Sequence, residues 1–160
     1  MALRPDQTQT LSRFVPGEGI AVALTELLDR DSHLLEVDAN ERSITFRFGF
    51  YLQAQFPDWT VDCEYNRDGI DPKRLNHLEL YPDSEDDDAK TVFPDVIVHH
   101  RGTSENYLVI EFKKSTSRVD PVIDLAKLRG YKEQLGYEYA LFVVVGTSDQ
   151  ANIARLEWVV

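Results

Sequence analysis

The chain contains little cysteine and no long apolar run. Cys63 is the only cysteine, so no internal disulfide can form. The longest apolar run, Tyr139 to Val145, is far too short to span a bilayer. The N-terminal residues lack the apolar core of a secretory signal. We therefore expect an intracellular, cytoplasmic protein that contacts no membrane.

Several signatures of enzyme and metal sites are also missing. The sequence has no glycine-rich phosphate loop, no Cys/His spacing typical of zinc sites and no nucleophilic-serine signature. The net charge of −11 argues against a generic nucleic-acid coat or packaging protein. Part of this charge lies in a run from Asp83 to Asp88, which lacks the glycine and terminal glutamate of an EF-hand loop. We interpret that run as a solvated loop.

The length and the apolar content predict a single folded domain. The 160 residues are 42% hydrophobic, which is ordinary for a protein with one sizeable core. Residues 1–18 are polar and end at the turn signal Pro16-Gly17, so they are expected to form a loose N-terminal arm. The domain is then expected to span residues 19–160. Between Arg101 and Lys132 basic residues are in excess, which is compatible with a phosphate backbone nearby.

The hydrophobic pattern predicts an α/β domain. After a short helix over 20–28, the expected order is a helix over 38–55, strands over 59–66, 92–100 and 107–113, a helix over 120–135, and a strand over 139–145. The residues between 67 and 90 are polar and are interpreted as a solvated connection. The short polar segment from Arg101 to Asn106 predicts a hairpin between the second and third strands.

Three charged residues interrupt the two apolar strands of this hairpin. Asp95 lies on the first strand, and Glu111 and Lys113 lie on the second. Side chains on a strand alternate between its faces, so Glu111 and Lys113 project from the same face. Charged groups in such surroundings are paired or bind a metal ion. The structural alternative is a salt bridge from Lys113 to Asp95 or Glu111.

The pattern Pro94-Asp95, fifteen residues, then Glu111-Phe112-Lys113 resembles the PD-(D/E)xK nuclease superfamily. The resemblance covers roughly residues 38–146, and the predicted order of elements agrees with it. It implies a restriction-endonuclease-like αβββαβ core, in which helices flank a central mixed sheet. It also implies a metal-dependent endonuclease that hydrolyses phosphodiester bonds in nucleic acid, with DNA as the expected substrate.

Asp95 and Glu111 are the expected ligands of Mg²⁺, for which Mn²⁺ is a possible substitute, because hard divalent cations prefer carboxylate oxygen. The resemblance adds the backbone carbonyl of Phe112 as a further ligand. Lys113 is expected to orient the attacking water and to offset charge in the transition state.

Glu41 is the candidate for a third acidic residue of the site. It shares a helical face with apolar residues, which directs it towards the sheet, and relatives carry an acidic residue on this helix. The alternative is a capping box with Asp38, which explains a glutamate at this position equally well. Glu64 on the first strand is the fallback for the same role.

The second long helix carries Asp124, Lys127, Tyr131 and Gln134 near one face. Lys127 and Tyr131, together with Lys114 on the preceding strand, are the candidate substrate-binding residues. The alternative for the helix is a solvated face with an Asp124–Lys127 ion pair.

His99 and His100 do not form a metal site in this interpretation. Adjacent strand residues point to opposite faces, and His99 lies about 13 Å along the strand from Asp95. Both histidines are expected at a solvated strand end.

Two functions other than catalysis stay open. The chain could be an inactive nuclease fold that binds nucleic acid or protein, or an acidic interaction protein that mimics nucleic acid. The intact Asp95, Glu111 and Lys113 set favours the enzyme. Because there is little room for a separate recognition domain, a homodimer or a larger complex is expected.

Overall fold

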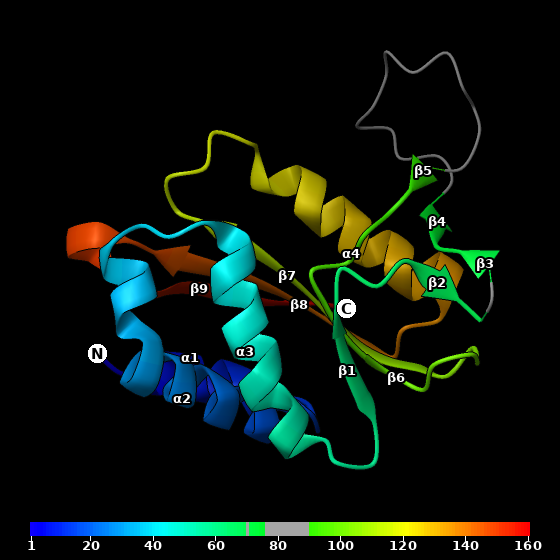
Figure 1. The fold of residues 1–160 in the computed structure, drawn as a ribbon, viewed down its shortest axis with the longest axis horizontal. Helices are drawn as coiled ribbons and strands as arrows, with labels where there is room; N and C mark the ends of the chain where they lie inside the picture. The colour runs from blue at the N-terminus through cyan, green and yellow to red at the C-terminus, as the bar shows by residue number, and fades with distance from the viewer. Residues whose placement is uncertain (70, 76–89) are drawn as a thin grey trace.

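The computed structural model describes residues 1–69, 71–75 and 90–160. The helices are α1 (Pro5–Leu11), α2 (Gly17–Glu36), α3 (Glu41–Gln55) and α4 (Pro121–Leu135), with a short 3₁₀ turn, η1 (Ser148–Gln150). The strands are β1 (Thr60–Cys63), β2 (Arg67–Asp68), β3 (Asp71–Pro72), β4 (Arg74–Leu75), β5 (Lys90–Thr91), β6 (Val96–His99), β7 (Asn106–Lys114), β8 (Tyr139–Gly146) and β9 (Asn152–Val159). Figure 1 traces this order along the chain.

A five-stranded mixed sheet forms the centre, with the strand order β1-β6-β7-β8-β9. The strands β1, β6 and β7 are antiparallel neighbours, which confirms the expected hairpin. β7 and β8 are parallel and are joined through α4, as a parallel pair requires. β9 returns antiparallel to β8. The α/β class is confirmed, and α3, β1, β6, β7, α4 and β8 follow one another in the expected order, with β2–β5 inserted after β1.

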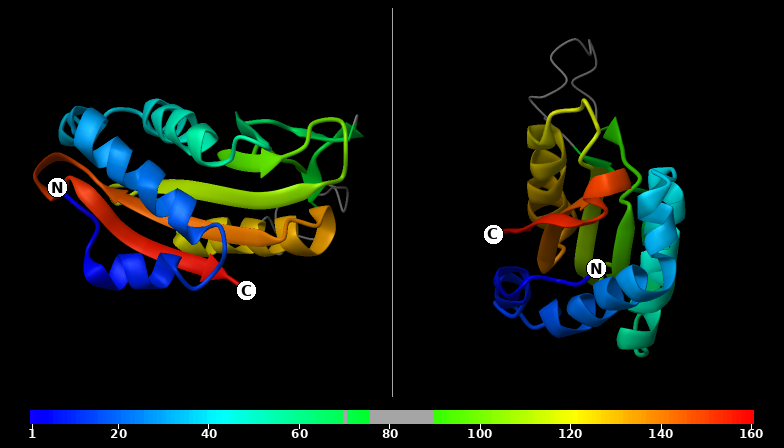
Figure 2. Two further views of the ribbon diagram at one scale, coloured as in Figure 1. Left: turned by 90° about the horizontal axis from the view of Figure 1, so that it is seen from below. Right: turned by 90° about the vertical axis from the view of Figure 1, so that its left-hand side faces the viewer.

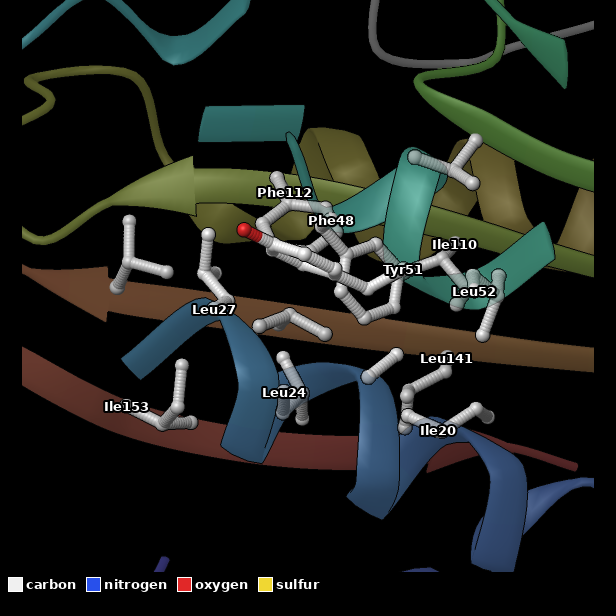
Figure 3. Packing of buried hydrophobic residues seen from close by; sticks show 14 of the residues in the cluster. Ile20, Leu24, Leu27, Phe48, Tyr51, Leu52, Ile110, Phe112, Leu141 and Ile153 are labelled. Carbon is white, nitrogen blue, oxygen red and sulfur yellow. The ribbon is translucent and has the colours of Figure 1, made fainter. Parts of the chain in front are cut away.

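Helices cover both faces of the sheet. Figure 2 shows α2 and α3 on one face and α4 on the other. The alternation along β7 matches this layering, because Ile110 and Phe112 belong to the core under α2 and α3, whereas Val109 packs on the α4 side. Figure 3 shows the first core, where Phe48 of α3 lies against Phe112.

Helix α3 begins beside the C-terminal end of β7, where its first residue, Glu41, bonds to the Lys114 N–H. Its N-cap is Asn40, whose side chain accepts a hydrogen bond from the Ser43 N–H. Further along, a Cβ on Gly49 would lie 2.8 Å from the Cys63 sulfur, so glycine permits the close approach of α3 to β1. Because Asn40 is the N-cap, the helix begins at Glu41, three residues later than the sequence predicted.

The N-terminal residues are not a loose arm. α1 lies along β9 because the buried Gln7 side chain donates to the Ile153 carbonyl at 2.8 Å, and the Trp158 indole N–H donates to the Thr10 carbonyl at 2.8 Å. Leu11 is fully buried in the main core. The expectation for residues 5–11 was wrong because β9, which supplies these contacts, was not predicted.

Three further expectations need correction. The short helix over 20–28 is the much longer α2, and the strands over 59–66 and 92–100 are shortened to β1 and β6. β1 ends early because Glu64 has a positive φ of 53°, which breaks the alternation of the strand. The solvated connection contains β2–β5, and Leu75 within it is buried against α4. The acidic run over 83–88 lies outside the described residues.

Candidate active site

Asp95 and Glu111 meet where β6 begins. Val96 pairs with Ile110 across the two strands, and one further step of this register sets Asp95 opposite Glu111. Glu111 is 3% exposed, and Asp95 is partly buried. The two carboxyl groups that were expected to bind Mg²⁺ therefore lie opposite each other on neighbouring strands.

The two carboxyl groups are in hydrogen-bonding contact. Burial raises the pKa of Glu111 well above its usual range, and the charge of Asp95 raises it further. Burial also raises the pKa of Asp95, while the hydrogen bond from Glu111 opposes this effect. The pKa of Glu111 is therefore raised both by its burial and by the neighbouring acid, because two adjacent carboxylate charges repel each other.

On the edge that faces β6, residues of β7 that extend past the start of β6 bond to carboxyl groups instead of to a neighbouring strand. The Phe112 N–H donates to Asp95 Oδ2 at 2.8 Å, and the Lys114 N–H donates to the Glu41 carboxyl group. The N–H and C=O of one strand residue point to the same side. The Phe112 carbonyl therefore faces this edge between the two carboxyl groups, as a metal ligand at that position would have to.

Glu41 belongs to this cluster and not to a capping box. Burial raises its pKa to about 7, the nearby charge of Asp95 raises it as well, and Lys113 opposes the rise. Asp38 does not cap α3, since Asn40 does, and Asp38 instead pairs with Lys114 at 3.0 Å. The capping alternative for Glu41 is thus wrong. The raised pKa of Glu41 follows first from its burial and then from its position beside Asp95.

Lys113 is held by helix α4. Its ammonium lies 2.7 Å from Asp124 Oδ2, and the two residues are only 8% and 6% exposed. The expected alternatives were a pair between Lys113 and an acid of the motif, or an Asp124–Lys127 pair on a solvated face. The observed partner of Lys113 is Asp124, and the solvated face is wrong because Asp124 is buried.

Two more residues of α4 reach the motif acids. The Tyr131 hydroxyl donates to Glu111 Oε1 at 2.9 Å in a fully buried contact. The positive charge of Lys127 acts on both Asp95 and Glu111 and lowers the pKa of each. The structure therefore brings Lys127 and Tyr131 to the site, where Tyr131 contacts a motif carboxyl group; a substrate contact for either stays a prediction.

The side chains of the remaining candidates, Lys114 and Glu64, have partners outside the carboxyl cluster. Lys114 bonds to Asp38 and to the Ala39 carbonyl, at 3.2 Å, and so ties the chain after α2 to the end of β7. Its role in substrate binding stays a prediction. Glu64 is exposed and pairs with Arg42 at 3.2 Å, whereas Glu41 lies beside Asp95 and Lys113; a catalytic role for either stays a prediction.

The histidines differ from each other. His99 is buried and bonds to Asp62 at 2.7 Å, so the expectation of a solvated end was wrong for this residue. Asp62 also accepts from Arg101, which explains how a polar side chain is tolerated there. His100 stacks on Trp59 with ring centres 4.0 Å apart. Gln134 has contacts of its own, and its place in the site stays a prediction.

The donor set fits a hard divalent cation. Within the part of the chain that the structure describes, no group of three or more His, Cys, Asp and Glu side chains has the arrangement of a complete metal site. Mg²⁺, however, commonly takes one or two carboxylates and completes its shell with water and phosphate. The contact between Asp95 and Glu111 marks the position that a cation would take, because the carboxyl oxygen atoms already converge there.

The ion pair between Lys113 and Asp124 was not predicted from the sequence. A signal for it was present, because Asp124 lies one and two turns before Lys127 and Tyr131 on the same face of α4. A helix that joins two parallel strands packs back on their sheet, so this face had to meet the face of β7 that carries Glu111 and Lys113.

Comparisons with known proteins provide no family and no function for this chain. No protein-family model, curated protein or solved structure matches the chain. Among the helices of residues 1–69 and 90–160, none combines the length and apolar character needed to cross a membrane.

Proposed function

We propose that this protein is a Mg²⁺-dependent nuclease of the restriction-endonuclease-like fold, with nucleic acid, and DNA in the first place, as its substrate. One observation carries the proposal: the carboxyl groups of Asp95 and Glu111 are in hydrogen-bonding contact, and Lys113 on the same strand face as Glu111 is buried. A purely structural role would not need three charged groups there, because a buried ion pair adds little net stability compared with apolar residues.

Asp95, Glu111 and the Phe112 carbonyl would hold the cation, with Glu41 as a possible further ligand. Bound Mg²⁺ supplies a Lewis acid that lowers the pKa of water and offsets phosphate charge, and Mn²⁺ can supply the same chemistry. Tyr131 fixes the orientation of Glu111 through its hydroxyl. The chain therefore preorganises the oxygen donors before any substrate arrives.

Lys113 and Glu41 contribute charge and proton exchange. The ammonium of Lys113 lies beside the acids and can offset negative charge that develops on the attacked phosphate. Asp124 keeps it in place. Glu41, with a pKa of about 7, can accept a proton from an attacking water near neutral pH.

The test is cleavage by the purified protein with Mg²⁺ or Mn²⁺ on duplex, single-stranded and branched DNA and on RNA. Lys113→Ala should abolish cleavage while Mg²⁺ binding persists, because Lys113 acts on the transition state and the metal ligands remain. Lys132→Ala is the matched control, since this lysine of α4 contacts the Val159 carbonyl and lies outside the proposed site.

A second variant separates loss of activity from loss of folding. Lys113→Ala leaves Asp124 buried without its partner. Lys113→Met/Asp124→Leu replaces the ion pair with apolar side chains, so it should fold and still not cleave. Cleavage by this double variant would contradict the role of Lys113.

The acidic composition supports a second candidate, a nuclease fold that binds without cutting. The net charge of −11 and the neutralisation of Lys113 by Asp124 are both compatible with a site that never turns over. Binding of a nucleic acid without cleavage across the substrate panel would favour this candidate. Absence of binding would favour an acidic interaction protein.

A further inference from the structure

The outer side of α3 exposes two aromatic rings close to the proposed active site. Phe46 and Phe50 are each 60% exposed. A spacing of four residues puts them on one face, one turn apart, while Ile44, Phe48 and Leu52 fill the core on the opposite side of the helix. The core therefore does not account for Phe46 and Phe50. Arg42 continues the same face one turn earlier and is also exposed.

This face, defined here as the α3 aromatic face (Arg42, Phe46 and Phe50), is continuous with the site. Arg42 follows Glu41 in the chain and bonds to Glu64 at 3.2 Å. The Glu64 N–H in turn bonds to the carbonyls of Pro94, at 2.9 Å, and Asp95, at 3.2 Å. A strand of polymer that leaves the carboxyl cluster past Arg42 would next meet Phe46 and then Phe50.

The exposed area is small for a protein partner. An aromatic side chain buries about 150–250 Å² when it is fully covered, so the two rings together offer roughly 200–300 Å². A stable dimer interface needs about 800 Å² on each partner. The α3 aromatic face alone is therefore too small to hold a second copy of the chain.

The chemistry of the face fits an unpaired nucleic-acid strand. Every base has a flat face that stacks on an aromatic ring regardless of sequence. Arg42 adds a guanidinium group whose exposed pair with Glu64 is weak enough for a phosphate to displace. The Arg47 guanidinium lies 5.0 Å from the centre of the Phe50 ring and is paired with Asp31 at 2.9 Å, so it supports the ring and is not counted as a phosphate contact. Bases inside a duplex are already stacked on each other and cannot use such a surface.

We propose that the α3 aromatic face binds an unpaired strand that continues from the phosphodiester held at the site. This inference rests on the proposed function and narrows its substrate class to single-stranded nucleic acid, or to duplexes with a single-stranded tail. Blunt duplexes are then poor substrates.

The experiment measures binding and cleavage separately. Binding is followed by fluorescence anisotropy in Ca²⁺ with a labelled single-stranded oligodeoxynucleotide of mixed sequence and with its blunt duplex. Phe46→Leu/Phe50→Leu, which keeps apolar bulk but removes the flat rings, should weaken single-strand binding about tenfold or more. Duplex binding should change little. Val15→Ala, at an exposed position outside this face, is the control.

Each result has a distinct meaning. Single-strand affinity that is unchanged in the double variant overturns the inference, and it leaves the proposed function standing if the wild-type protein still cleaves. Ring-dependent binding without any cleavage supports the inference and removes the catalytic proposal. A wild-type dimer that the double variant converts to a monomer, measured by sedimentation, assigns the face to a second copy and also overturns the inference.

Discussion

Lys113 and Asp124 bring opposite charges into a space that water barely reaches. Removal of one partner leaves the other charge buried without compensation, which typically costs about 3–5 kcal/mol. We expect Asp124→Asn to lower the free energy of unfolding by about 3 kcal/mol, measured by urea denaturation. Arg42→Ala breaks an exposed pair with Glu64 and should cost about 1 kcal/mol or less. Equal effects of the two variants would contradict the buried character of the Lys113 pair.

Glu41 makes the stability of the metal-free protein depend on pH in an unusual direction. Its pKa rises from the ordinary 4.5 to about 7 on folding, so the folded state keeps the proton that the unfolded chain has lost. The free energy of unfolding should therefore fall as the pH rises from about 4.5 to about 7. Glu41→Gln should reduce this fall, as measured by urea denaturation across that range in EDTA. A steeper fall in the variant would show that Glu41 is not the group responsible.

Among the elements, α1 stabilises the fold although its sequence is polar. Leu11 is fully buried, so Leu11→Ala should lower the free energy of unfolding by about 2–4 kcal/mol. Val15 is largely exposed, and Val15→Ala should change it by about 0.5 kcal/mol or less. Thermal or urea denaturation measures both. If Leu11→Ala is as mild as Val15→Ala, then α1 is not docked in solution.

The ends of two helices show which boundaries follow from local sequence and which depend on tertiary contacts. Helix α4 was predicted closely, because Asp120 as N-cap, Pro121 at the first position and Gly136 in the left-handed region all act locally. The start of α3 was missed, since Asp38 and Asn40 are both good caps in sequence, but Asp38 has a positive φ of 52° and pairs with Lys114. That contact joins residues far apart in sequence.

Strand β9 was missed for a related reason. Its inward side chains, Ile153 and Trp158, are not separated by a multiple of two, because a register irregularity between Val144 and Val145 breaks the alternation. Without β9, nothing in the sequence indicates what α1 would pack against. The two errors therefore have one cause.

At the scale of the molecule, the candidate site combines the neighbouring strands β6 and β7 with one helix from each face of the sheet, α3 and α4. Asp95, Glu111 and Lys113 could be placed from the alternation of two adjacent strands. The part played by Asp124 could not, because it depends on how α4 crosses over β7. Glu41 reaches the site from the opposite layer, and its carboxyl group bonds to the Lys114 N–H only because β7 extends beyond β6.

Because these carboxyl groups lie together, Mg²⁺ and protons should compete for the same carboxyl oxygen atoms. In the metal-free state the pKa values of Glu41, Asp95 and Glu111 are all raised, so the folded protein retains protons that a bound cation would displace. A ligand that binds only the folded state raises the unfolding temperature. We expect millimolar Mg²⁺ to raise it more at pH 8 than at pH 5.5, measured by differential scanning fluorimetry.

Asp95→Asn/Glu111→Gln provides the control for that measurement. The amide groups keep the size and the hydrogen-bonding capacity of the pair but carry no charge for a cation to neutralise. The double variant should lose the Mg²⁺ effect at both pH values and should retain a stable fold, with Lys113 still paired to Asp124. If Mg²⁺ raises the unfolding temperature of wild type and variant equally, the cation binds elsewhere and the metal site at Asp95 and Glu111 is wrong. A wild-type effect that is larger at pH 5.5 would instead contradict the competition between Mg²⁺ and protons for these carboxyl groups.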